Sequence, residues 1–229
     1  MRAAGGYARV RIAIEGLSPI PAPGQFLMVR LPWGPALPRA LSTLAAGPDW
    51  VEFLLKAEGA LRGAMASSPR DAAVDLRGPY GVPYIERIDD RRTYVLVGGG
   101  SGVAPLLHFA ASHPEFVERT AFGFRSRDVR DLLPEVDFAC EDETGETAED
   151  RLSARWKEGL GIIACGPESL LASVARCHRA SPDAYVSLES RLGCGFGACL
   201  SCSISTTSGM RRVCVDGPLF PCSEIPWLG

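Results

Sequence analysis

The stretch Thr93-Tyr-Val-Leu-Val-Gly-Gly-Gly-Ser-Gly-Val103 decides the fold of the central part of the chain. Its first half predicts a buried strand, and Gly98–Gly102 follow as a glycine loop. From Val103 to Ser112 apolar residues recur at helical spacing, and Pro105 suits the first turn of that helix. A strand, a glycine loop and the start of a helix form a site suited to the pyrophosphate of a dinucleotide. The loop is not a full G-x-G-x-x-G, because Val103 stands at the last position, so a tight turn without a ligand remains the alternative.

Strands and helices continue to alternate on the carboxyl side of this stretch. The pattern predicts strands over residues 120–124, 160–164 and 185–188, an acidic stretch over 141–150 and a helix over 168–179. In an open α/β sheet, ligands gather beyond the carboxyl ends of the strands, so the turn Cys165-Gly-Pro-Glu168 would lie beside the glycine loop. Cys165 would then abut a nicotinamide, or it is a small buried residue at a strand end. The predicted nucleotide-binding residues are Gly98, Gly99, Gly100, Ser101, Gly102, Cys165, Gly166, Pro167 and Glu168.

The chain before residue 91 has the pattern of a small antiparallel β-barrel. Short strands are predicted over residues 7–14, 25–31 and 50–56, with Pro- and Gly-rich breaks between them and a helical pattern only near 61–67. We therefore expect a multidomain protein of β and α/β type. Its predicted units are a β-barrel (1–90), a doubly wound nucleotide-binding α/β domain (91–187) and a small C-terminal domain (188–229).

The composition is that of an ordinary globular protein. Of the 229 residues, 46% are hydrophobic and 22% are charged, which allows a sizeable core. The net charge of -3 argues against nucleic acid as the main partner. The sequence has no run of roughly 18 apolar residues, as a membrane helix needs, and no apolar segment of a signal peptide near its start. We therefore expect a cytoplasmic protein that binds neither nucleic acid nor membrane and keeps its cysteines reduced.

Five of the eight cysteines lie after residue 193, and four of them have a characteristic spacing. Gly193-Cys-Gly-Phe-Gly-Ala-Cys-Leu-Ser-Cys202 and Val213-Cys-Val-Asp216 together read Cys-x4-Cys-x2-Cys-x11-Cys, the plant-type order of a [2Fe–2S] cluster. The glycines allow the loop to turn tightly and to aim backbone amides at sulfur. The predicted ligands are Cys194, Cys199, Cys202 and Cys214, with Cys222 outside the set. A structural zinc site is the alternative, although it typically uses two short cysteine pairs.

The order of these motifs resembles the ferredoxin-reductase superfamily, whose barrel binds flavin and whose α/β domain binds a pyridine nucleotide. The resemblance rests on Arg39-Ala-Leu-Ser42 and Gly78-Pro-Tyr-Gly81, followed by the glycine loop and Cys-Gly-Pro-Glu. Residues 187–202 and the segment Arg212-Val-Cys-Val-Asp-Gly-Pro-Leu-Phe220 narrow it further. They are similar to the C-terminus of the electron-transfer subunits of dihydroorotate dehydrogenase B.

This resemblance implies an oxidoreductase subunit that holds FAD and a [2Fe–2S] cluster. Electrons would pass from the FMN of a dihydroorotate-oxidising catalytic subunit, through the cluster and FAD, to NAD⁺, in pyrimidine (UMP) biosynthesis. The implied assembly is a heterotetramer with two copies of each subunit. Small subunits of sulfide dehydrogenase or of NADH-dependent ferredoxin:NADP oxidoreductase are the alternatives with the same fold. A non-catalytic zinc-bound scaffold is the alternative of another class.

The resemblance also implies flavin contacts. In the family, the Arg of an R-P-x-S motif contacts the FAD pyrophosphate and the Ser lies near the isoalloxazine, which gives these roles to Arg39 and Ser42. The motif's Pro is Ala40 here, and the Thr of the family's Gly-Thr turn is absent at Gly63-Ala64. The residues implied for FAD are Arg39, Ala40, Leu41, Ser42, Leu54, Leu55, Lys56, Gly63 and Ala64. The sequence does not decide between NAD and NADP, because it identifies no acidic residue that would contact the ribose.

Overall fold

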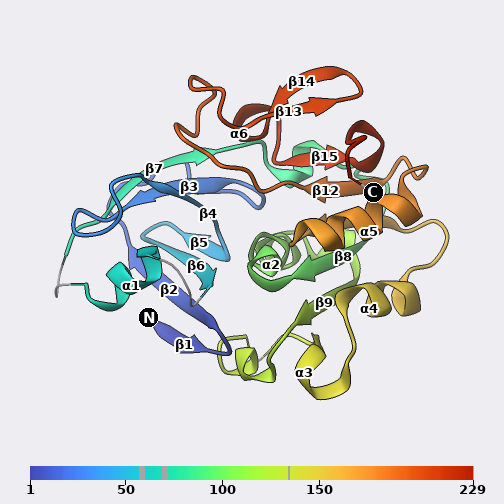
Figure 1. The fold of residues 1–229 in the computed structure, drawn as a ribbon, viewed down its shortest axis with the longest axis horizontal. Coiled ribbons are helices and arrows are strands. Elements are labelled where there is room, and N and C mark those ends of the chain that lie inside the picture. Colours follow the sequence, from blue (N-terminus) through green and yellow to red (C-terminus); the bar gives the residue numbers. More distant parts are fainter. Residues whose placement is uncertain (57–59, 69–71, 134, 229) are drawn as a thin grey trace.

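The computed structural model describes residues 1–56, 60–68, 72–133 and 135–228. Two antiparallel sheets form the N-terminal part (Figure 1). The first has the order β1 (Arg2–Ala4), β2 (Tyr7–Ala13), β6 (Trp50–Lys56), β5 (Ala45–Gly47). The second has the order β4 (Arg39–Ser42), β3 (Phe26–Arg30), β7 (Asp75–Tyr80), and the helix α1 (Ala60–Ala66) lies between β6 and β7 in the sequence.

Alternating apolar residues hold the two antiparallel sheets together. In β2, Val10 is buried and pairs with the buried Phe53 of β6. Leu27 and Val29 of β3 belong to the same hydrophobic cluster, so the two sheets share one core. The period of two that predicted residues 7–14 as a strand therefore reflects real burial on one face. The predicted antiparallel β unit is confirmed.

The α/β part contains one six-stranded sheet. Its order is β10 (Ala139–Cys140), β9 (Val117–Phe124), β8 (Tyr94–Gly99), β11 (Gly161–Cys165), β12 (Ala184–Ser187), β15 (Leu219–Pro221). The first five strands are parallel, and β15 is antiparallel to β12. From β8 the chain adds β9 and β10 on one side of the sheet, and it then returns to add β11 and β12 on the other side of β8. This reversal of strand order is typical of a doubly wound sheet. The predicted doubly wound unit is confirmed.

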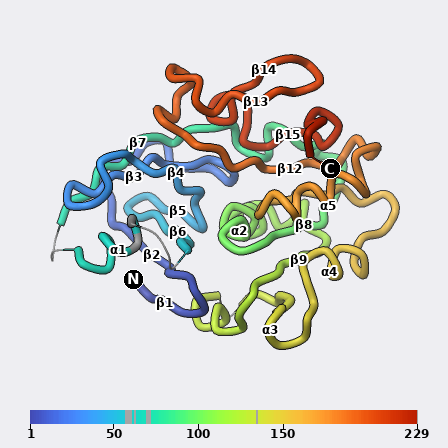
Figure 2. The backbone as a smooth tube through the Cα atoms, in the orientation of Figure 1, coloured from blue at the N-terminus to red at the C-terminus, as the bar shows by residue number. Residues whose placement is uncertain are grey.

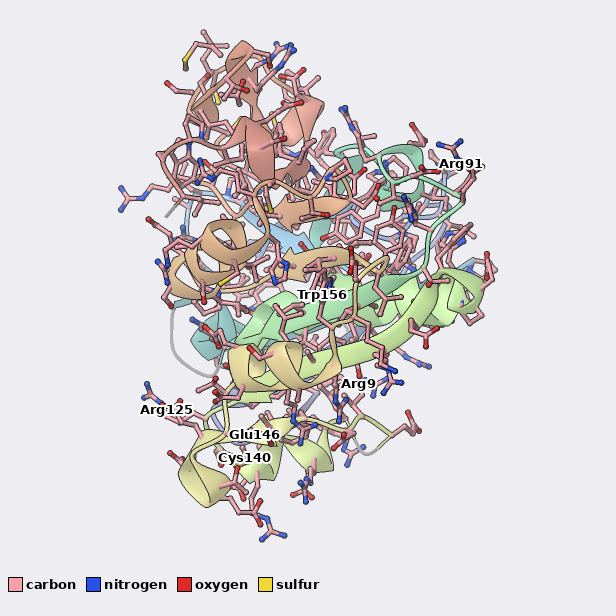
Figure 3. All side chains as sticks on the ribbon, turned by 90° about the vertical axis from the view of Figure 1, so that its right-hand side faces the viewer. Arg9, Arg91, Arg125, Cys140, Glu146 and Trp156 are labelled. Carbon is pink, nitrogen blue, oxygen red and sulfur yellow. The ribbon has the colours of Figure 1, made fainter. Side chains whose placement is uncertain are left out.

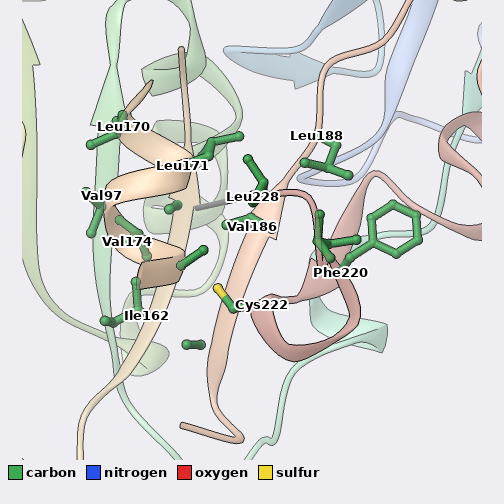
Figure 4. Packing of buried hydrophobic residues seen from close by; sticks show 14 of the residues in the cluster. Val97, Ile162, Leu170, Leu171, Val174, Val186, Leu188, Phe220, Cys222 and Leu228 are labelled. Carbon is green, nitrogen blue, oxygen red and sulfur yellow. The ribbon is translucent and has the colours of Figure 1, made fainter. Parts of the chain in front are cut away.

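Helices cover both faces of this sheet. They are α2 (Val103–Ser112), α4 (Ala148–Arg155) and α5 (Glu168–His178). The single-turn helix α3 (Glu141–Thr144) follows the edge strand β10 and buries none of its residues. Successive residues of β8 point to opposite faces: Val95 and Val97 pack with α5, whereas Leu96 packs with α2. Figure 4 shows Val97 beside Val174 of α5 in the first of these clusters. Both faces of β8 are therefore buried, as its continuous apolar run predicts.

The C-terminal segment folds back onto the other two parts (Figure 2). It contains the hairpin β13 (Ser203–Thr206) and β14 (Gly209–Arg212), the helix α6 (Val213–Asp216) and β15. In β15, Phe220 pairs with Val186 of β12, and it packs with Ile225 and Leu228 in the cluster shared with α5. The division into 1–90, 91–187 and 188–229 stays a prediction.

Several short elements were not predicted from the sequence. The acidic stretch 141–150 contains α3 and the start of α4, and the cysteine-rich tail contains β13, β14, β15 and α6. Short 3-10 helices also occur at Tyr84–Glu86, Gly100–Gly102, Pro114–Phe116, Arg127–Asp131 and Cys222–Glu224. The start of α4 did carry a signal, because Thr147 and Asp150 form a capping box. Among the helices in the described part of the chain, none combines the length and apolar composition needed to cross a bilayer.

A buried polar contact joins the β unit to the α/β unit and makes stability depend on pH. Thr43, directly after β4, lies with its Oγ1 2.9 Å from Nδ1 of His108 on α2, and both side chains are buried. Burial lowers the pKa of His108 to about 4, with a smaller contribution from His113. Because this pKa lies below the unfolded value, the contribution of neutral His108 is present above about pH 6.5 and is lost as pH falls toward 4.

Replacing His108 with Gln should therefore flatten the acid side of the stability profile. The wild type should lose about 2 kcal/mol more than H108Q between pH 7 and about pH 5, measured as the free energy of unfolding in urea. H113Q, on a partly exposed side chain at the end of the same helix, is the control and should lose nearly as much stability as the wild type, because burial and not His113 is the main cause of the lowered His108 pKa. Equal pH dependence of H108Q and the wild type would show that His108 is not buried as a neutral group.

Candidate functional site

Two strand-to-helix turns meet where the strand order reverses. The glycine loop follows β8, and the turn Cys165-Gly-Pro-Glu168 follows β11, the neighbouring strand. A Cβ atom on Gly102 would lie 2.5 Å from the carbonyl oxygen of Cys165, so only glycine allows this close approach. In doubly wound sheets this reversal is where ligands bind. The two turns therefore lie side by side, as the sequence predicts.

A cavity of about 270 Å³, called here the central cavity, opens beside these turns. Its wall comes from all three parts of the chain: the β unit, the two turns, and the segment that leads into the cysteine loop. Its lining includes Phe26, Ala40, Leu41, Ser42, Leu54, Leu55, Lys56, Ser101, Cys165, Ser187, Leu188, Glu189, Ser190, Leu192, Val213 and Pro218. Six of the nine residues implied for FAD thus line one cavity. The volume of this cavity is close to the lower end of the range of roughly 300–1,000 Å³ that ligand pockets have.

Three of the residues implied for FAD lie outside the lining of this cavity. Arg39 is exposed at the start of β4, and no ion pair of its guanidinium occurs within the described ranges. Gly63 and Ala64 lie on α1, where the carbonyl of Ala64 accepts a hydrogen bond from Nε1 of Trp33 at 2.9 Å. The exposed Arg39 directly precedes the lining residue Ala40, so its guanidinium starts from the edge of the central cavity. Gly63 and Ala64 of α1 do not line this cavity.

A buried polar group stands at the back of the central cavity. The Tyr84 hydroxyl donates to Oγ of Ser187 at 2.7 Å, and the Cys165 thiol lies within hydrogen-bonding reach of both. Burial raises the pKa of Cys165 to about 12 and also raises the pKa of Tyr84. Cys165 is therefore a neutral thiol near pH 7, which fits a packing or hydrogen-bonding role and not a nucleophile.

Glu189 was not identified from the sequence. It lies two residues after the end of β12 and lines the central cavity together with Lys56. The surrounding protein raises the pKa of Glu189, and the Lys56 ammonium partly opposes that increase. The signal available in the sequence was its position after a strand at the carboxyl edge of the sheet. Glu189 and Lys56 therefore give the cavity one acidic and one basic side chain.

A second cavity, of about 490 Å³ and called here the nucleotide pocket, lies on the other side of the glycine loop. Of the residues predicted for a nucleotide, Gly99, Gly100 and Pro167 line it, while Ser101 and Cys165 line the central cavity. Gly98, Gly102, Gly166 and Glu168 complete the two turns between the cavities. Lys56 lines both cavities, so they adjoin at its side chain.

The nucleotide pocket also contains residues that the sequence did not indicate. Tyr7 comes from the start of β2, and the others come from the ends of β9 and β10 and from the start of α4 and the residues before it. These others include Arg125, Glu141, Glu146, Thr147 and Glu149. Figure 3 shows Arg125, Cys140 and Glu146 close to one another in this region. The amide of Asp142 donates to the carbonyl of Arg125 at 2.9 Å, which ties the ends of β9 and β10 together. Arg125 and Glu141 each follow a parallel strand, which is the position where such residues are expected.

The four predicted cluster cysteines form two pairs of free thiols. Sγ of Cys202 and Sγ of Cys214 are 3.2 Å apart and buried. The amide of Cys199 donates to Sγ of Cys194 at 3.5 Å. In the described part of the chain, no three His, Cys, Asp or Glu side chains are grouped around a single metal position. Two thiol pairs are the donor set that two bridged iron ions require, one pair for each iron.

The backbone around the cysteines is shaped for thiolate sulfur. Gly197 has a φ of +87°, a Cβ on it would lie 2.7 Å from the side chain of Val215, and its amide bonds to Cys214. Hydrogen bonds from the side chain and amide of Ser201 lower the pKa of Cys199 to about 6. Burial raises the pKa of Cys214 to about 12, so a metal must displace that proton on binding. The residues present therefore fit a [2Fe–2S] cluster.

Comparisons with known proteins identify the family of this chain. Residues 189–226 match the family described as the iron–sulfur cluster binding domain of dihydroorotate dehydrogenase B. The dihydroorotate dehydrogenase B (NAD(+)) electron transfer subunit of Bacillus mycoides is 31% identical over 229 residues, covering 89% of this chain and 86% of that protein. The corresponding subunit of Clostridium acetobutylicum is 29% identical over 213 residues, covering 89% and 85%.

A solved structure shows the same fold. The NADH-dependent reduced ferredoxin-NADP oxidoreductase structure superposes with a TM-score of 0.81, covering 99% of this chain and 87% of that chain at 24% identity. The predicted fold class is confirmed by this likeness, and the predicted resemblance is confirmed by the curated relatives. The chain belongs to the family of electron transfer subunits of dihydroorotate dehydrogenase B.

Proposed function

We propose that this chain carries electrons from the FMN of a dihydroorotate dehydrogenase catalytic subunit, through a [2Fe–2S] cluster and FAD, to NAD⁺. It is an oxidoreductase subunit of UMP biosynthesis, and dihydroorotate itself is oxidised on the partner. The names of the relatives support this role, because both are electron transfer subunits of an NAD(+)-dependent dihydroorotate dehydrogenase B.

One observation carries the proposal: the central cavity touches both of the other sites. Val213, beside the cluster ligand Cys214, and Leu192, two residues before Cys194, line the cavity that also contains Ser42. On its other side, Lys56 is shared with the nucleotide pocket. A flavin in the central cavity would therefore lie between the cluster and the dinucleotide, which is the order that electron transfer to NAD⁺ requires.

The side chains of the chain position these groups and control protons around them. When bound, the cluster passes single electrons and the flavin converts two of them into one hydride. Leu54, Leu55 and Phe26 give the central cavity an apolar wall, which would keep water away from a bound flavin. Ser42 offers a hydroxyl, and the neutral Cys165 offers a compact surface for the nicotinamide. The Glu189 carboxyl, whose pKa burial raises, is the acid that faces this space and can hold a proton there.

The surface beside the cysteines supports docking of a partner subunit. Phe196 and Leu200, on either side of Cys199, are 57% and 60% exposed, and Val215 next to Cys214 is 37% exposed. Apolar side chains grouped on an exposed surface typically mark a protein interface. A catalytic subunit docked there would bring its FMN close to the cluster. We propose that two copies of each subunit assemble into a heterotetramer.

Co-expression with a candidate catalytic subunit tests the proposed function most fully. The purified complex should reduce NAD⁺ when dihydroorotate is added under anaerobic conditions. The chain alone should not, because in this proposal dihydroorotate is oxidised on the partner subunit. If the chain instead co-purifies with a large multi-cluster subunit and shows no dihydroorotate-dependent reduction, it serves a complex of the sulfide dehydrogenase or ferredoxin:NADP oxidoreductase type.

Replacing Cys199 with Ser should remove the cluster. Cys199 is exposed, so the change disturbs little packing, but it deletes one of four thiolate ligands. Iron content and visible absorption of the cluster should fall to a small fraction of the wild-type values. Cys177→Ser, on an exposed thiol of α5, is the matched control and should retain its iron. Full iron content in C199S would exclude Cys199 as a ligand.

Replacing Arg39 with Ala should weaken FAD binding. The loss of one charge-assisted contact to the pyrophosphate should cost about 1.5–3 kcal/mol, measured as the FAD dissociation constant of the apoprotein. Arg30→Ala, on the neighbouring strand β3 and ion-paired with Asp75, is the control for removing an exposed arginine. An unchanged FAD affinity in R39A would contradict the assignment of the pyrophosphate contact.

A further inference from the structure

One end of the nucleotide pocket adjoins the central cavity, and the other end does not. This difference determines which way round the dinucleotide of the proposed function would bind. Near Lys56 and the glycine loop, the pocket adjoins the central cavity, so the nicotinamide half must leave by this end to reach the flavin. The pocket then crosses the end of β9 and reaches the starts of α3 and α4. The adenosine ribose would therefore lie at this far end.

Glu141 brings an unbalanced negative charge to the far end. It is the first residue after β10, and no cation pairs with its carboxylate within the described ranges. Glu146, in the same wall, is neutralised by Arg151 at 3.1 Å. Glu149 lies in the first turn of the two-turn helix α4, where backbone amides offset a negative charge, whereas α3 is a single turn.

Arg125 provides the opposite charge nearer to the glycine loop. It is exposed after β9, and it forms no ion pair within the part of the chain that the structure describes. Arg125 lines the nucleotide pocket together with Tyr7 and Gly100, and the Tyr7 ring packs edge-on against Phe124, the residue before Arg125, at 5.6 Å between ring centroids. Burial raises the pKa of Tyr7, and the Arg125 guanidinium partly opposes that increase. The Tyr7 hydroxyl in turn lies against Gly100, where an added Cβ would be 2.8 Å away. Arg125 is therefore placed for a pyrophosphate at the glycine loop.

We propose that Glu141 makes the pocket selective for NAD⁺ over NADP⁺, while Arg125 binds the pyrophosphate that both nucleotides share. A carboxylate at the ribose accepts hydrogen bonds from its free hydroxyl groups. The same carboxylate repels a phosphate on the 2′ position, because two negative charges would meet in a partly enclosed pocket. The inference rests on the proposed function, which makes a pyridine nucleotide the electron acceptor.

Calorimetric titration of the purified, cofactor-loaded chain with NAD⁺ and with NADP⁺ tests this inference. The wild type should bind NAD⁺ at least about tenfold more tightly, a difference of about 1.4 kcal/mol. Glu141→Gln should reduce the preference about tenfold by strengthening NADP⁺ binding. Arg125→Ala should weaken both nucleotides by a similar factor. Asp142→Asn is the matched control, because it removes one negative charge from α3 outside the pocket lining and breaks no ion pair within the described residues, and it should keep the wild-type preference.

Three results would overturn the inference without touching the proposed electron transfer, which the dihydroorotate assay measures separately. These are an E141Q variant with the wild-type preference, a change of preference in Glu149→Gln in place of E141Q, and an R125A variant that weakens NADP⁺ alone. A wild type that binds NADP⁺ as tightly as NAD⁺ would also overturn it. Failure of the wild type to bind either nucleotide would overturn the inference and the NAD⁺ acceptor role together.

Discussion

The reversal of strand order between β8 and β11 is the constraint on which the arrangement of the sites depends. It places two strand-to-helix turns side by side, and the contact between Gly102 and the Cys165 carbonyl leaves room for no larger side chain. The β unit closes the space above these turns, so the central cavity has walls from both parts. The nucleotide pocket lies on the other side of the same glycine loop. One feature of the sheet thus brings the proposed flavin site and the proposed dinucleotide site into contact.

The cysteine loop joins this arrangement because the tail is part of the sheet. β15 pairs with β12, and Phe220 belongs to the hydrophobic cluster to which α5 also contributes (Figure 4). The loop between Cys194 and Cys202 has little apolar burial of its own, since Phe196 and Leu200 face solvent. Packing therefore anchors the tail, whereas the cluster itself must stabilise the loop that surrounds it.

Much of this architecture was predictable, and the exceptions share a physical cause. β2, α2 and α5 were predicted because burial on one face leaves a period in the sequence. The cysteine spacing identified the cluster loop because a metal site needs its ligands within a short reach. β15 and α6 are too short to leave a period, and their pairing partners lie elsewhere in the chain. Glu189, Arg125 and Glu141 were missed because sequence shows where a strand ends, but not which cavity its next side chain enters.

The central claim is that the chain holds a [2Fe–2S] cluster beside a flavin. The most direct test is the content of iron, acid-labile sulfide, zinc and FAD in the wild-type chain purified without oxygen. The account predicts iron and sulfide in equal amounts, with about two of each per FAD, and no stoichiometric zinc. Zinc without sulfide and without flavin would contradict it and would support a structural scaffold.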